Sequence, residues 1–130
     1  MTPATRLTMA SGGRASEREA AISNAIAGLS DPAKTIAIVL EGMPDGSGRL
    51  EDLAGSTRNG QIAIPIRIAP GCLCCTGNLI LRVTLNRILR HPPDFLYISV
   101  ATNTHLEQLR AFLGAPPYEK LLLITKDIQV

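Results

Sequence analysis

The chain has 130 residues, of which 45% are hydrophobic and 18% are charged, and its formal net charge is +2. This length suits one core, so we expect residues 1–130 to form a single domain. The hydrophobic fraction excludes a disordered polymer, and the small net charge gives no large basic surface for nucleic acid. The apolar runs are far shorter than the roughly 20 residues that span a bilayer, so no membrane partner is expected.

The N-terminal residues and the cysteines indicate a cytoplasmic protein. The chain begins without the long apolar segment of a secretory signal, which favours a reducing compartment for its thiols. Its three cysteines, Cys72, Cys74 and Cys75, all lie in the run GCLCCT. Their C-x-C-C spacing differs from the C-x-x-C spacing of thioredoxin-type redox motifs, so a redox role is disfavoured.

Short apolar runs alternate with helical periodicity along the chain, which predicts an α/β fold with a mainly parallel sheet. Ser16 and Glu19 have the spacing of a capping box at the start of the first helix. In residues 62–68 isoleucine takes every second position, which predicts one packed face, and Pro65 indicates an edge strand. The expected strands cover residues 7–10, 35–40, 62–68, 95–100 and 121–125, and the expected helices cover residues 15–29, 78–89 and 104–113.

A sheet of this kind places its ligand crevice at the C-terminal ends of its strands. Three segments follow expected strands directly: the loop of residues 11–14, Glu41, and residues 101–103. We therefore expect these segments to meet at one edge of the sheet.

GCLCCT, between a short strand and a leucine-rich helix, resembles the metal-associated motif of the CobW-type GTPases, relatives of the UreG and HypB metallochaperones. Three more runs occur in the order of that family: TIAIVLEG, HPPDFLYISVAT and KLLLITKDIQV. In the first of them, Glu41 stands at the family's strand-end glutamate. The resemblance covers nearly the whole chain. It implies a three-layer P-loop-NTPase-like fold of the SIMIBI type, truncated before the family's C-terminal domain.

The phosphate-binding loop of that family is altered here. Such a loop needs G-x-x-x-x-G-K-[ST], because the glycine amides and the lysine hold the phosphates and the hydroxyl holds magnesium. This chain has ASGGRAS, with Arg14 in place of the lysine and Ser16 one position past the hydroxyl. The acidic group of the family's Glu-Thr-Ser/Thr-Gly is also missing. We expect no magnesium-dependent GTP hydrolysis, which favours a protein that is not an enzyme, and at most weak nucleotide binding at Gly12, Gly13, Arg14 and Ser16.

The cysteines suit a metal site, because thiolates are soft ligands for zinc and related metals. In an extended segment Cys72 and Cys74 point one way and Cys75 the other, so all three reach one ion only if the loop turns sharply. The resemblance implies Glu41 as their partner. The predicted ligands are Cys74, Cys75 and Glu41, with Cys72 as a fourth or alternate ligand, for zinc first and for cobalt or another transition metal otherwise. His91 and His105 are reserve candidates.

Two functions stay open. The first is a metal-binding domain with a metallochaperone or metal-homeostasis role, which would also contact a client protein. The second is a non-catalytic structural or partner-binding module of the same fold, compatible with residual nucleotide binding, in which the cysteines only pack as small apolar residues. A homodimer that covers the edge strand is compatible with either function.

Overall fold

The structure is a computed structural model that describes residues 4–29, 34–42, 50–51, 62–63, 65–68, 79–101 and 106–130. Strands and helices alternate along the chain, as the sequence predicts. The elements are β1 (Thr5–Ser11), α1 (Ala15–Ala27), β2 (Ile36–Glu41), β3 (Ile66–Ile68), α3 (Leu79–Ile88), β4 (Phe95–Val100), α4 (Leu106–Leu113), the 3-10 turn η2 (Tyr118–Lys120), β5 (Leu122–Ile124) and β6 (Ile128–Gln129).

The strands form one sheet of six strands in the order β3-β2-β4-β1-β5, and β6 also pairs with β1. Every pairing described is parallel, which confirms the predicted sheet type. β1 pairs with β5 near its start and with β6 near its end, so those two short strands extend one side of the sheet in turn. β2, β4 and β1 each have a neighbouring strand on both sides, so these three strands form the centre of the sheet.

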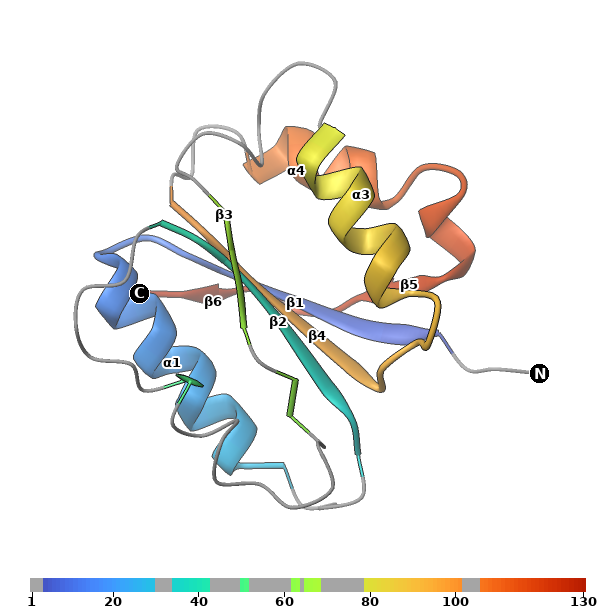
Figure 1. Ribbon diagram of the computed structural model, residues 1–130. Coiled ribbons are helices and arrows are strands. Elements are labelled where there is room, and N and C mark those ends of the chain that lie inside the picture. Colours follow the sequence, from blue (N-terminus) through green and yellow to red (C-terminus); the bar gives the residue numbers. More distant parts are fainter. Residues whose placement is uncertain are drawn as a thin grey trace.

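Helices cover both faces of this sheet, with α1 on one face and α3 and α4 on the other (Figure 1). Right-handed crossover connections explain this placement. The step from β1 to β2 runs in one direction across the sheet, whereas the steps from β3 to β4 and from β4 to β5 run in the other. The fold is thus a three-layer α/β/α arrangement.

Alternation along each strand divides the core into two parts, because successive side chains of a strand point to opposite faces. Leu7 and Met9 of β1 pack in the core under α3 and α4, whereas Ala10 packs in the core under α1. β2 is buried along its whole length, as expected for a strand that is covered on both faces. On the helices, Ile22 and Leu85 are fully buried at positions that the helical periodicity predicts.

The edge strand differs from its prediction. Ile62 forms an isolated bridge to Ile36 and packs under α1, whereas Ile66 and Ile68 pack on the opposite face. The expected single packed face over residues 62–68 is therefore wrong, because Ile62 pairs with Ile36 and Ile66 with Val39, so that three steps along β2 correspond to four along this segment and the alternation shifts by one residue. Pro65 lies between these two pairings and has no N–H to donate. The predicted edge position of this strand is confirmed.

Candidate functional site

Buried polar side chains gather at the C-terminal edge of the sheet. Ser11 ends β1, Glu41 ends β2 and Ser99 lies near the end of β4; none is more than 2% exposed. Arg18 of α1 joins them at 3% exposure. Such polar groups are rarely buried unless they have partners. Apolar packing alone does not explain this cluster, which makes it a candidate functional site.

The cluster lies at the point where the strand connections diverge. β1 and β4 are neighbours, but the chain leaves β1 towards β2 and leaves β4 towards β5, in opposite directions. A crevice opens between such strands at their C-terminal ends, and ligands of α/β sheets bind there. The sequence prediction that residues 11–14, Glu41 and residues 101–103 meet at one edge is confirmed for its described residues, because Arg18 joins Gly12 and Gly13 to Ser99, and Ala101 contacts Glu41; residues 102 and 103 lie outside the described residues.

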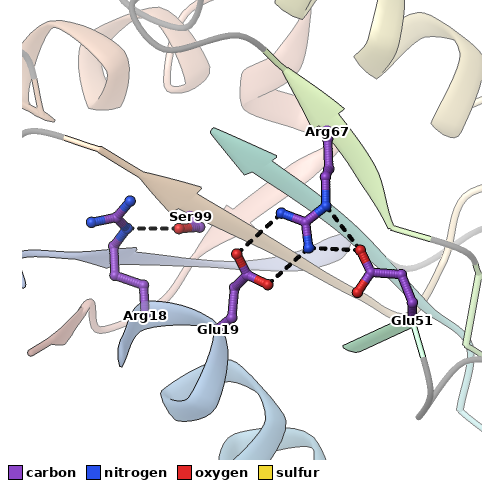
Figure 2. A network of polar contacts seen from close by, with 5 residues as sticks. All are labelled: Arg18, Glu19, Glu51, Arg67 and Ser99. Carbon is purple, nitrogen blue, oxygen red and sulfur yellow. Dashed lines mark hydrogen bonds and ion pairs between the residues drawn. The ribbon is translucent and has the colours of Figure 1, made fainter. Parts of the chain in front are cut away.

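Arg18 fills the space between the first loop and β4. Its Nε donates a hydrogen bond of 2.8 Å to Ser99 Oγ, and its Nη1 donates bonds of 3.1 Å to the carbonyl oxygens of Gly12 and Gly13 (Figure 2 shows the bond to Ser99). Burial lowers the pKa of Arg18, while the nearby carboxylates, Glu41 foremost, act to raise it. Arg18 is thus a fixed positive charge between the first loop and β4, and the sequence reasoning did not find it.

Glu41 is the one predicted metal ligand within the described residues. It is 2% exposed, and its Oε1 accepts a hydrogen bond of 2.7 Å from the amide of Ala101, just after β4. This bond ties the end of β2 to the end of β4. The predicted ligands Cys72, Cys74 and Cys75 lie outside the described residues, as does His105. Within the part of the chain that the structure describes, no group of three or more His, Cys, Asp or Glu side chains could hold a metal ion.

The loop predicted to hold phosphate has its own contacts. Gly12 and Gly13 have φ values of +87° and +52°, a region that favours glycine. The amide of Arg14 donates a bond of 2.9 Å to Glu17 Oε1, so a carboxylate already takes the amide at the start of this helix. An anion bound there would meet the Glu17 charge. Ser16 lies within the first turn of α1.

The predicted capping box of Ser16 and Glu19 is wrong. α1 begins one residue earlier than Ser16, with Arg14 as its N-cap, and Glu17 occupies the third helical position. Arg14 directly follows the glycine pair, so the N-cap lies closer to the N-terminus than Ser16. Glu19 is therefore not a capping residue, and its carboxylate makes a different contact.

Glu19 belongs to a charged network between α1 and the edge strand (Figure 2). Arg67 of β3 donates to both of its carboxylate oxygens, at 3.1 and 3.0 Å, and also donates from Nε to Glu51 Oε1 at 2.9 Å. These partners raise the pKa of Arg67, the bond to Glu19 first, although burial opposes the shift. The network fixes β3 against α1. The alternation of isoleucine over residues 62–68 leaves Arg67 on the face opposite Ile66 and Ile68, and it gives no sign of these partners.

His91 does not join Glu41. It follows the end of α3 and lies beside the first residues of β2, at the N-terminal edge of the sheet. As a reserve ligand for the Glu41 site it has the wrong position in this structure.

Comparison of the chain with protein-family models, with curated proteins and with solved structures finds no match in any of the three. The resemblance to the CobW-type GTPases thus stays a prediction that depends on the quoted motifs. Among the described helices, none has the length and apolar character needed to cross a membrane.

Proposed function

We propose that this chain is a CobW-like, GTPase-derived domain that binds one transition-metal ion, zinc in the first instance, without hydrolysing GTP. The ligands are Cys74, Cys75 and Glu41, with Cys72 as the fourth or alternate ligand. Its role is that of a metallochaperone or of a protein of metal homeostasis.

The observation that carries this proposal is the strand register. Glu41 is paired with Ile68 across β2 and β3, and the Gly42 amide donates a bond of 2.9 Å to the Ile68 carbonyl oxygen. Cys72 follows Ile68 by four residues in sequence. A chain of four residues spans at most about 14 Å, and a tether of this length starting beside Glu41 is compatible with Cys72 as a ligand partner of that carboxylate.

The ligand chemistry is consistent. Zinc takes thiolate sulfur at about 2.3 Å and carboxylate oxygen at roughly 2.0–2.2 Å, in a tetrahedral set of four ligands. Three thiolates and one carboxylate would leave the zinc complex with a net negative charge. Arg18, whose positive charge acts on Glu41, would offset part of that charge. Its bonds to the first loop and to Ser99 hold it in place.

The fold is compatible with descent from a P-loop NTPase of the SIMIBI type. The strand that precedes the glycine pair is central, α1 follows it, and the crevice lies at its end. Hydrolysis is not part of the proposal, because Arg14 replaces the phosphate-binding lysine and Glu17 takes the amide of Arg14.

Cobalt titration tests the ligand set. Co²⁺ bound by thiolates absorbs in the near ultraviolet and visible, so its spectrum reports sulfur ligation. Wild-type protein should bind one equivalent with thiolate bands, and the variant with Cys74→Ser and Cys75→Ser should lose them. Glu41→Gln should keep the thiolate bands with weaker affinity, by about 10-fold or more, because a ligand charge is lost. Unchanged affinity in the double cysteine variant would refute the ligand assignment.

The second candidate is a partner-binding module, here one that binds a second copy of this chain. The observation that favours it is an apolar outer face on α3, where Leu79 is 72%, Ile80 48% and Val83 52% exposed. Sedimentation velocity separates the two candidates. A dimer that forms without metal and dissociates in Leu79→Ser, Val83→Ser protein would favour this module; a monomer that binds zinc would favour the metal site.

A further inference from the structure

A cleft with a volume of about 440 Å³ lies at the N-terminal edge of the sheet, at the opposite end of β2 from Glu41. This volume falls within the roughly 300–1,000 Å³ that small-molecule sites occupy. Its described walls come from the start of β2, the segment before β3, the end of α3 and the turn before β4. The apolar residues on them are Ile36, Ala37, Ala63, Ile88, Pro92 and Pro93.

Several polar groups around this cleft already have partners within the protein. The Thr35 amide and hydroxyl both donate to Asp94 Oδ2, at 2.9 and 3.2 Å, and the Thr35 carbonyl oxygen accepts from the amides of Asp94 and Phe95. The Ala63 amide donates to the Ile36 carbonyl oxygen at 3.0 Å. These bonds also hold the two sides of the cleft together, so its shape is set without a ligand.

His91 supplies the imidazole on this wall, and it is exposed. Exposed cations directly precede two of the lining residues: Lys34 comes before Thr35, and Arg90 comes before His91. The nearby carboxylate of Asp94 already accepts two hydrogen bonds from Thr35. The polar part of the cleft is therefore a hydrogen-bond donor in a basic setting.

We propose that this cleft binds a small monocarboxylate with an apolar body. The body packs between Ile36, Ile88 and the two prolines, and the carboxylate accepts a hydrogen bond from the His91 imidazole. An apolar cleft with one directing polar group is the usual form of a small-molecule site. The site is separate from the proposed metal ligands and does not depend on them.

Two-dimensional ¹H–¹⁵N NMR of the full chain tests this site with benzoate as the probe and benzyl alcohol as its neutral counterpart. Benzoate should shift the amides of Ala37, Ile88 and His91 in a saturable manner, with a Kd on the order of millimolar for so small a ligand. Benzyl alcohol should bind at least several-fold more weakly. Absence of saturable shifts at these amides would overturn the proposal, and equal binding of the two probes would overturn the carboxylate assignment.

Two variants locate the binding. Ala63→Leu adds bulk from an exposed position into the cleft and should weaken benzoate by more than 10-fold, whereas Ala111→Leu on exposed α4 surface should leave it unchanged. His91→Gln should weaken benzoate several-fold and leave benzyl alcohol unaffected. Matched amide spectra away from the cleft confirm that each variant is folded. Binding that survives Ala63→Leu would contradict this location.

Discussion

Replacing Arg67 by methionine removes the cation that Glu19 and Glu51 share. The Glu19 side chain is only 3% exposed and that of Arg67 is 18% exposed, so the substitution leaves a buried carboxylate without its partner. Loss of one member of a buried ion pair costs about 3–5 kcal/mol, and the partial exposure of Arg67 favours the lower end, about 3 kcal/mol. For a chain of 130 residues, this loss lowers Tm by about 10 °C.

Urea and thermal denaturation followed by circular dichroism measure this effect. Arg90→Met is the matched control, because Arg90 is exposed, and its free energy of unfolding should stay within about 0.5 kcal/mol of wild type. Adding Glu19→Leu to Arg67→Met should restore most of the lost stability, since no unpaired charge then stays buried under α1. Glu51 is 35% exposed, but its Oε2 is buried without a hydrogen-bond partner within the described residues, so part of the loss stays with this carboxylate. The reasoning fails if Arg67→Met costs no more than the control, or if the double variant is less stable than the single one.

Three further predictions follow from single positions. Gly12→Ala should lower the free energy of unfolding by about 1–3 kcal/mol, because φ is +87° and a Cβ would lie 2.6 Å from a main-chain oxygen. Gly28→Ala, with φ of −80° and no close contact, should be neutral or stabilise by up to about 1 kcal/mol. Chemical denaturation of the two variants measures both effects. Burial raises the pKa of Tyr97, so above about pH 10 the unfolded state loses its proton first and stability falls; in Tyr97→Phe, unfolding free energies measured from pH 9 to 11 should decline less steeply. Leu85→Ala should cost about 2–5 kcal/mol and Leu79→Ala almost nothing, because their exposures are 0% and 72%, and equal losses in urea melts would contradict the placement of α3.

The order of elements was predictable because the local patterns are strong. Residues 36–40 form a nearly continuous apolar run, as a strand buried on both faces requires, and the stripe of Leu81 and Leu85 repeats with helical spacing. Both patterns can be recognised within one segment, without knowing which other segments pack against it. The sheet order, by contrast, depends on which strands meet, and nothing local in the sequence encodes it.

Predictions from short sequence patterns were wrong where the surrounding structure changed the start of a helix or the pairing of a strand. The Ser16 and Glu19 pair has capping-box spacing, but α1 begins at Ala15 after two glycines with positive φ. Over residues 62–68 the alternation of isoleucine assumes regular pairing, whereas the pairings of Ile62 and Ile66 differ by one residue from that pattern and put Ile62 on the other face. The short strand β6 was missed because two residues carry almost no periodicity.

The candidate site was predictable only in part. Glu41 was found because it ends an apolar strand, and strand ends of a parallel sheet meet at one edge. Arg18 and Arg67 were not found, because their partners are distant in sequence: Ser99 is 81 residues from Arg18, and Glu19 is 48 residues from Arg67. Arg18 lies in a helical pattern and Arg67 in a strand pattern, and neither pattern shows a partner; only the packing of α1 on the sheet brings Arg18 to Ser99 and Arg67 to Glu19.

Zinc content tests the central claim most directly. Wild-type protein purified without chelator, and protein refolded with zinc and desalted, should each carry close to one equivalent by mass spectrometry of the metal. The variant with Cys74→Ser and Cys75→Ser, prepared in the same way, should carry almost none. Far less than one equivalent in both wild-type preparations, or the same zinc content in the variant, would contradict a metal site built from these cysteines and Glu41.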